Sequence, residues 1–222
     1  GNNLTGALDV VTTGARPHIT AQLEAGALDL TGLTGGKGGA SGTAGGAAAE
    51  GWSKTPIDAS ALGLADADIA LSASSLDLGQ FQFGRADIRL GIDAARAVAQ
   101  LKQLEGYGGS ITGQLVANNR SGLSVGGDLN AQGIDMERLL RDAAGITRFA
   151  TTGAARLNFL GVGQSVDAIM HSLSGNLSLA TGRGVISGFD LDRLMRSGDG
   201  SGGTTVFDSL TASFVIKDGD MR

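Results

Sequence analysis

Between Asp66 and Val125 the side chains alternate between apolar and polar with a period of two, and this alternation constrains the fold of the chain more than any other feature. Ile69, Leu71 and Ala73 occupy alternate positions and point one way, while Asp68, Ala70 and Ser72 point the other way. The same pattern recurs after short turns at residues 76–78, 81–83, 88–92, 111–115 and 123–125. Successive Cβ atoms of a strand point to opposite faces, so each segment is a strand with one apolar and one polar face. We therefore expect a mainly β fold built on a long, curved antiparallel sheet with a continuous apolar surface.

The composition indicates a thin core. Aromatic residues make up only 4% of the chain, whereas there are 38 glycines and two prolines among 222 residues. Glycine in this proportion suits strand ends, bulges and tight turns. A core of small aliphatic side chains with few rings argues against the dense interior of a two-sheet sandwich.

Charge narrows the classes of partner. The formal net charge is -5, and no run of Lys or Arg occurs, so we expect no nucleic-acid partner and no electrostatic docking on an anionic membrane. The absence of cysteine fits a bacterial periplasm but is also common in the cytosol. There is neither an 18-residue apolar run nor a signal sequence.

The pattern predicts three parts. Residues 1–34 continue a truncated sheet, residues 35–51 form a flexible Gly/Ala-rich loop, and residues 52–222 form the main β-groove domain. Short helices are expected near residues 136–144, 165–173 and 190–196, with Asp135, Ser165 and Asp190 as N-caps. Each helix should cover the sheet with its apolar side, and in the third helix Leu191, Leu194 and Met195 are expected to face inward.

The apolar face of the expected sheet is the candidate binding site, because a ladder of aliphatic side chains can hold acyl chains without hydrogen bonds. A closed, ordinary core beneath the helices is the alternative interpretation of the same residues. The predicted lining consists of Ile69, Leu71, Phe81, Phe83, Ile88, Leu90, Ile92, Ile111, Leu115, Leu123, Val125, Leu157, Phe159, Leu177 and Leu179.

The sequence offers little for catalysis, and we expect no enzyme, no cofactor and no metal site. There is no cysteine nucleophile, and His18 and His171 lie far apart. No Gly-x-Ser-x-Gly turn stands between a strand and a helix with a credible catalytic triad. Residues 198–203 are rich in Gly and Asp, but calcium-binding repeats of that kind need stacked copies.

Several stretches in the same order resemble the C-terminal part of AsmA family proteins. They are WSKTPID (52–58), DADIAL (66–71), YGGSITG (107–113), GRGVISGFDL (182–191) and VFDSLTASF (206–214). Each stretch is weak alone, and their order and spacing make the resemblance specific. It covers nearly everything outside the Gly/Ala-rich segment.

The resemblance implies a periplasmic protein of Gram-negative bacteria, tethered to the inner membrane in the full-length protein by an N-terminal anchor that is missing here. Members of the family are similar to bridge-like lipid transfer proteins, whose taco-shaped sheets form an apolar trough. The implied partners are phospholipids or other acyl-chain lipids, with a role in lipid transport and outer-membrane homeostasis. The alternative is a structural or protein-binding β module in envelope assembly, including the assembly of outer-membrane proteins, with a closed core and envelope protein partners.

Overall fold

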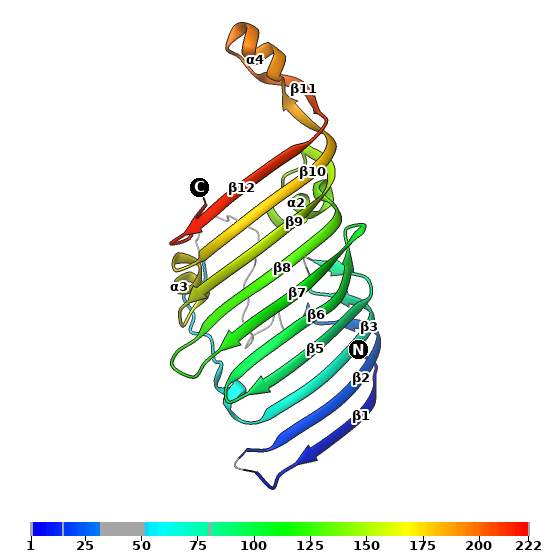
Figure 1. Cartoon of the computed structure of the whole chain (residues 1–222), viewed down its shortest axis with the longest axis vertical. Coiled ribbons are helices and arrows are strands. Elements are labelled where there is room, and N and C mark those ends of the chain that lie inside the picture. Colours follow the sequence, from blue (N-terminus) through cyan, green and yellow to red (C-terminus); the bar gives the residue numbers. More distant parts are fainter. Residues whose placement is uncertain (1, 15, 32–51, 80, 222) are drawn as a thin grey trace.

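The computed structural model describes residues 2–14, 16–31, 52–79 and 81–221, and these form one open β-sheet. The sheet has 13 strands in the described part of the chain, in the order β1-β2-β3-β5-β6-β7-β8-β9-β10-β12-β13, with β4 paired to β3 and β11 paired to β10. Figure 1 shows the strands side by side in a single layer. The expectation of a mainly β fold with a long sheet and short helices is confirmed.

The elements lie as follows along the chain. The strands are β1 Leu4–Val11, β2 His18–Asp29, β3 Asp66–Asp77, β4 Gln82–Phe83, β5 Ala86–Asp93, β6 Arg96–Gly106, β7 Gly109–Asn118, β8 Ser124–Asp135, β9 Phe149–Val162, β10 Ser174–Phe189, β11 Ser201–Phe207, β12 Leu210–Lys217 and β13 Asp220–Met221. The helices are η1 Ser60–Gly63, α2 Met136–Ala144, α3 Val166–His171 and α4 Leu191–Ser197. None of the helices in the described residues is long and apolar enough to cross a membrane.

One strand pair departs from the antiparallel pattern. β2 and β3 run parallel, from His18 opposite Asp66 to Asp29 opposite Asp77, whereas the other described pairs are antiparallel. This pair joins the segment before the Gly/Ala-rich loop to the segment after it, so both belong to the same sheet. The predicted loop itself, residues 35–51, lies outside the described residues.

The interruption of the alternation at Ser74 and Ser75 does not break the strand. β3 continues from Asp66 to Asp77, and the buried side chains shift from Ala73 to Leu76. β2 makes the same shift at the same level, from Ala25 to Leu28. The two strands therefore change phase together, which keeps their apolar side chains on one face.

The register places apolar residues in continuous rows across the strands, because directly paired residues lie on the same face. One row consists of Leu23, Leu71, Ile88, Leu101, Gly113, Leu129, Leu157, Leu177 and Phe214, and it crosses nine neighbouring strands. We call this side the apolar face. The adjacent row on the opposite side is Gln22, Ala70, Arg89, Gln100, Gln114, Asp128, Asn158, Asn176 and Val215, and we call that side the polar face.

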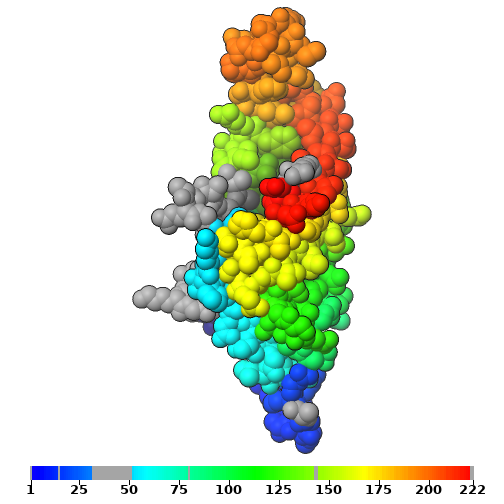
Figure 2. Space-filling view, turned by 90° about the vertical axis from the view of Figure 1, so that its left-hand side faces the viewer, coloured from blue at the N-terminus to red at the C-terminus, as the bar shows by residue number. Residues whose placement is uncertain are grey.

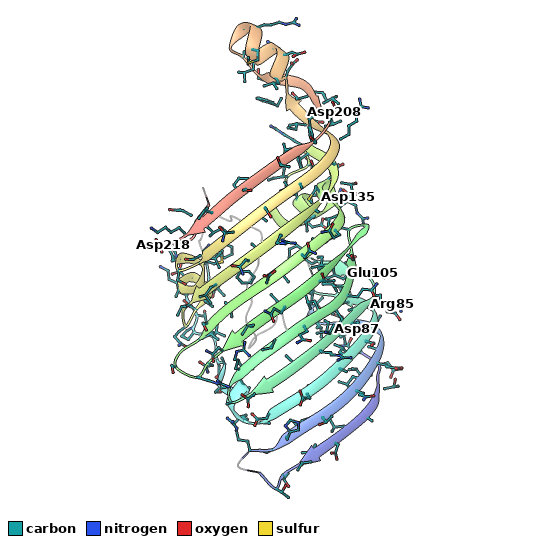
Figure 3. All side chains as sticks on the ribbon, in the orientation of Figure 1. Arg85, Asp87, Glu105, Asp135, Asp208 and Asp218 are labelled. Carbon is teal, nitrogen blue, oxygen red and sulfur yellow. The ribbon has the colours of Figure 1, made fainter. Side chains whose placement is uncertain are left out.

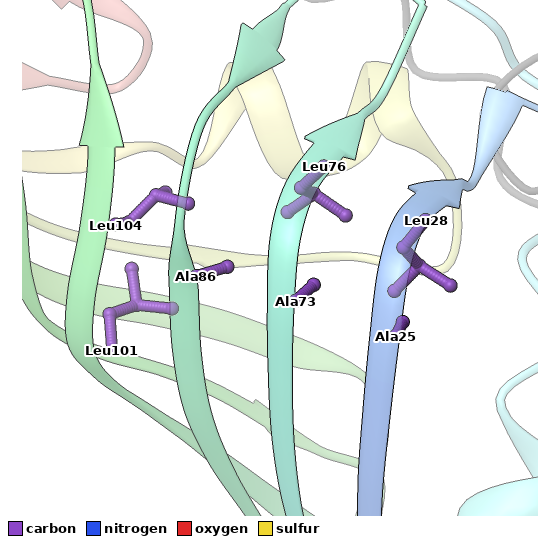
Figure 4. Packing of buried hydrophobic residues seen from close by; sticks show 7 residues of the cluster. All are labelled: Ala25, Leu28, Ala73, Leu76, Ala86, Leu101 and Leu104. Carbon is purple, nitrogen blue, oxygen red and sulfur yellow. The ribbon is translucent and has the colours of Figure 1, made fainter. Parts of the chain in front are cut away.

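A small core is built directly on the apolar face. Its first cluster comprises Ala25, Leu28, Ala73, Leu76, Ala86, Leu101 and Leu104 from four neighbouring strands, as Figure 4 shows. A second cluster comprises Tyr107, Ile134 and Met136, and it lies where α2 meets the sheet. Both clusters lie toward the same ends of the strands, so most of the apolar face lies outside them.

The three predicted α-helices form, with the predicted caps. Asp135, Ser165 and Asp190 accept hydrogen bonds from the backbone N–H of Arg138, Ala168 and Arg193, at 3.2, 3.2 and 2.9 Å.

The expected position of the third helix is wrong. Leu191 and Met195 do not face inward but are 46% and 81% exposed. α4 belongs to a hairpin of β10 and β11 that projects beyond one end of the sheet (Figure 1), so this helix has no sheet face to cover.

The apolar face as candidate functional site

The predicted lining residues on the strands share the apolar face. On β3 and β5, the lining residues pair across the two strands or follow one another at alternate positions along one strand. They are Ile69, Leu71, Ile88, Leu90 and Ile92. The rest of the strand set lies on the same face of β7 to β10, namely Ile111, Leu115, Val125, Leu157, Phe159, Leu177 and Leu179. Ile69 and Leu179, which are 110 positions apart in the chain, thus belong to one surface.

Three predicted lining residues lie at the ends of the strands instead. Phe81 and Phe83 pack against the cluster of Tyr107, Ile134 and Met136. Leu123 is only 3% exposed, and its carbonyl accepts a hydrogen bond from the N–H of Gly163 at 3.0 Å. Leu123 belongs to the core because it precedes β8 and is packed beneath the connection that follows β9.

The remaining strand residues of the predicted lining are neither fully buried nor fully exposed. Leu157, Phe159, Leu177 and Leu179 are half-buried, and Leu115 is 37% exposed. A closed core would bury such side chains almost completely, whereas these keep contact with solvent. The centre of the apolar face is therefore only partly covered.

Sequence reasoning missed the contribution of two strands to this face. β6 carries Ala97, Ala99, Leu101 and Leu104, which pair with apolar residues of β5. Its alanines are small, and the register shifts between Leu101 and Leu104. The alternation is therefore not evident in the sequence, in which β6 looks like an Ala-rich run. β12 adds Phe214 and Ile216 next to Leu177 and Gly175, although its alternating sequence was already a signal for a strand.

A helix covers the apolar face at one end of the strands. α2 follows the end of β8, and its Leu139 and Leu140 pack against the cluster of Tyr107, Ile134 and Met136, as do Ala131, Ala155 and Leu179 of the sheet. The ring of Tyr107 packs edge-on against Phe83, with ring centroids 6.1 Å apart. Burial, together with the nearby carboxylate of Asp142, raises the pKa of Tyr107 to about 12.

The opposite ends of the strands are covered by α3 and by residues 53–64. A Cβ on Gly161 would lie 2.8 Å from Ile169 of α3, which places this helix over the apolar face of β9. Ile57 donates its N–H to the carbonyl of Gln164 at 2.8 Å, and Asp167 donates to Ser53 at 3.0 Å. Figure 2 shows this segment, in cyan, lying against the α3 region. The described residues thus border the apolar face at both ends of its strands, and none of their helices covers it between those ends.

The polar face carries shallow hollows of its own. One of about 440 Å³ lies among Thr20, Gln22, Asp68, Arg89 and Gln100, above the small residues Ala70 and Gly91. Figure 3 shows Arg85, Asp87, Glu105 and Asp135 at one end of the strands. These hollows are shallow and lined in part by charged and amide side chains, so they suit an apolar ligand less well than the apolar face does.

The two histidines lie on different elements, each next to an aspartate. His18 Nε2 is 3.2 Å from Asp68 Oδ2, and His171 Nδ1 is 3.6 Å from Asp167 Oδ1. The second pair is spaced one helical turn apart, a relationship that the sequence already contained. Among the described residues, no group of three His, Asp or Glu side chains is placed to hold a metal ion.

These features define an open single-sheet β protein whose apolar face is bordered by short helices and is partly accessible. A family model described as the AsmA family matches residues 2–222, and the chain therefore belongs to the AsmA family. This membership is consistent with a role in lipid transport or in the bacterial envelope. No curated protein and no solved structure matches the chain.

Proposed function

We propose that the apolar face binds phospholipid acyl chains and carries them between the inner and outer membranes of a Gram-negative bacterium. The observation that supports this most is the row from Leu23 to Phe214, which is apolar across nine strands. Strand spacings of about 4.8 Å make such a row about 38 Å long, which exceeds the roughly 30 Å of a bilayer's hydrocarbon core. The row is long enough for extended lipid tails.

The chemistry of the face suits a ligand recognised by its length and apolarity. Each methylene moved from water onto such a surface gains about 0.8 kcal/mol, and the side chains make no directional demand on the ligand. Polar groups lie at the ends of the strands and on the other face, so a headgroup can stay in water while the tails lie along the sheet.

The corresponding location is the periplasm, with the full-length protein tethered to the inner membrane and supporting outer-membrane homeostasis. AsmA family membership supports an envelope location. The net charge of -5 gives the chain little attraction for anionic surfaces, which suits a carrier that meets lipid mainly through apolar contact.

A second candidate is a structural or protein-binding module in envelope assembly that does not carry lipid. The two buried clusters favour it, because they already close part of the apolar face, the second of them with residues of α2. The half-buried side chains of β7 to β10 favour lipid binding instead.

Native mass spectrometry of gently purified protein tests the proposal, with a matched pair of variants. Leu115 is 37% exposed on the apolar face, and Leu160 is 54% exposed on the polar face. Leu115→Asp should reduce bound phospholipid about tenfold or more, since the contact of one such side chain is worth roughly 1.5–3 kcal/mol. Leu160→Asp should leave it unchanged.

Photo-crosslinking gives the second readout. A crosslinker at Leu90 or Val125 should label with phospholipid, and Leu90→Asp together with Leu115→Asp should abolish capture. A folded double variant that retains its lipid, or wild-type protein without any lipid, would refute the proposal and favour the structural module.

A further inference from the structure

A hairpin projects from the end of the sheet, and we call it the finger (residues 184–207). Its base, at residues 184–186, is still paired to β9. The finger contains the second half of β10, β11 and α4 between them, and it extends beyond the other strands (Figure 1). Its pairing runs from Gly184 opposite Phe207 to Phe189 opposite Ser201. The finger therefore has only its own residues for support toward its tip.

Large apolar side chains are held in water on this finger. Met195 is 81% exposed, Val206 57%, Leu191 46% and Phe189 37%. Met195 is the most exposed of the large apolar residues described. Concentrated exposure of this kind marks an interaction surface more often than scattered single residues do.

The exposure comes from an ordered element. Thr205 Oγ1 donates to the carbonyl of Phe189 at 2.8 Å and accepts from the N–H of Leu191 at 3.0 Å. Arg193 pairs with Asp199 at 3.0 Å, and Gly198 ends the helix in the left-handed conformation. The finger is thus built to present Leu191 and Met195 outward.

α4 has the polarity of a helix that lies at a lipid surface. Leu191, Leu194 and Met195 share one side because they are three and four residues apart, and Asp192 and Arg193 lie elsewhere on the helix. Leu194 packs against the start of β11, since a Cβ on Gly200 would lie 3.2 Å from its Cβ. The two exposed side chains flank this contact.

One cation of the finger suits a phospholipid surface. Of the three carboxylates of the finger, Asp190 caps α4 and Asp199 pairs with Arg193, whereas Asp192 lies in the first turn of α4. Exposed Arg196, next to Met195, has no carboxylate of the described residues within ion-pair distance. A guanidinium beside exposed apolar side chains suits the phosphate and acyl boundary of a bilayer.

The apolar face leads directly to the finger. Leu179 on β10 is followed by Thr181, Gly184 and Ile186 on the same side, with Phe149 and Phe207 beside them. We propose that the finger inserts the apolar side of α4 into the surface of a phospholipid bilayer and so places one end of the apolar face at the membrane. The role given to this membrane contact rests on the proposed function, whereas the contact itself is argued from the geometry of the finger alone.

Flotation with zwitterionic phosphatidylcholine vesicles, which have no net charge, tests the insertion. Leu191→Asp combined with Met195→Asp should reduce the vesicle-bound fraction at least about tenfold, because two apolar side chains no longer enter the bilayer. The control combines Leu160→Asp with Val215→Asp, at sites that are 54% and 57% exposed outside the finger, and it should bind as the wild type does. All four positions are exposed or accessible, so the substitutions spare the core.

A fluorescent label makes the contact visible without loss of apolar surface. The chain has no cysteine, so Met195→Cys and Leu160→Cys each provide one attachment site for an environment-sensitive dye. The label at residue 195 should shift to the blue on addition of vesicles, and the label at residue 160 should not. Equal shifts, no shift, or binding that requires a membrane protein in the vesicles would overturn the proposal.

The two proposals fail separately. Leu115→Asp should lose lipid capture and keep vesicle binding, whereas the Leu191 and Met195 double variant should lose vesicle binding and keep lipid capture. If the second variant loses both while remaining folded, the finger belongs to the lipid-binding face and the docking proposal is wrong.

Discussion

The ring of Phe149 stacks on the ring of Phe207, with centroids 5.7 Å apart and an angle of 14° between the planes. Phe149 begins β9 and Phe207 ends β11, so the stack joins the finger to the sheet. Gly184 makes room for it, because a Cβ there would lie 2.4 Å from the tip of the Phe207 ring. An aromatic contact over a glycine thus fixes where the finger leaves the sheet.

Phe207→Ala should loosen this joint. The change removes the ring stack and its half-buried surface. We therefore expect the free energy of unfolding to fall by roughly 1–2 kcal/mol and hydrogen exchange to become faster at residues 184–187 and 204–207. Urea unfolding and hydrogen exchange measure the two effects. Val206→Ala is the control, because Val206 is 57% exposed on the other face. Equal effects of the two substitutions would contradict a specific role for the stack.

Gly109→Ala should be strongly destabilising. A Cβ at this position would lie 2.1 Å from the carbonyl oxygen of Gln132 and 2.6 Å from the carbonyl carbon of Gly133. These are backbone atoms of the neighbouring strand, which cannot rotate away, so β7 and β8 would have to separate. We expect a loss of about 2 kcal/mol or more in urea unfolding.

Gly26 provides the matched control within the same sheet. A Cβ at Gly26 meets nothing within 4 Å, so Gly26→Ala should change the free energy of unfolding by less than about 0.5 kcal/mol. A large effect at Gly26 and a small one at Gly109 would show that β-sheet propensity, not the close approach of the strands, decides the outcome.

Local patterns predicted much of this molecule because they act over a few residues. The alternation from Asp66 onward places β3 and β5 with the correct face inward, and Asp135, Ser165 and Asp190 mark the starts of three helices. These signals depend on side-chain direction and on unpaired N–H groups at helix starts, both of which are properties of the local chain.

The pairing and packing of segments far apart in the chain were not predictable in the same way. Nothing in residues 18–29 distinguishes parallel pairing with β3 from antiparallel pairing, because the alternation is the same in both cases. Likewise, the spacing of Leu191 and Met195 predicts an apolar side of α4 but not what that side meets. The hairpin carries this helix beyond the sheet, and that depends on β11 pairing with the far half of β10.

Arg120→Ala should weaken the strand ends next to α3. The guanidinium donates to the carbonyls of Ala94 and Asp93 at 2.7 and 3.0 Å and pairs with the Asp93 carboxylate at 2.7 Å. It thereby holds a turn in which Ala94 and Ala95 have φ of 47° and 62°, a conformation unfavourable for alanine. We expect a loss of roughly 1–2 kcal/mol by urea unfolding.

A substitution that relieves the strained backbone of that turn should raise the free energy of unfolding. Ala95→Gly should recover about 0.5–1 kcal/mol in the Arg120→Ala background, since glycine accepts the left-handed conformation. Arg96→Ala serves as the control for loss of an exposed guanidinium nearby. If Arg96→Ala costs as much as Arg120→Ala, net charge explains the effect better than the hydrogen bonds do.

Stability should fall at high pH through the single tyrosine of the chain. Burial, and secondarily the Asp142 carboxylate, raises the pKa of Tyr107 to about 12, whereas an unfolded tyrosine ionises near pH 10. Between these values the unfolded chain releases a proton that the folded protein keeps, so the free energy of unfolding decreases as pH rises. The expected loss is about 2–3 kcal/mol across this interval, with no contribution from Tyr107 below pH of about 9.

Tyr107→Phe isolates this effect, because lysines also titrate in the same range. The variant should lack the part of the pH slope that Tyr107 causes, and the difference between the two unfolding curves should grow from pH of about 10 upward. Ultraviolet absorbance of the tyrosinate reports the same ionisation directly, since Tyr107 is the only tyrosine. Tyrosinate formation near pH 10 in the folded protein would mean that the ring is accessible to water, and with it the packing of Phe83 and α2 around Tyr107 would be in error.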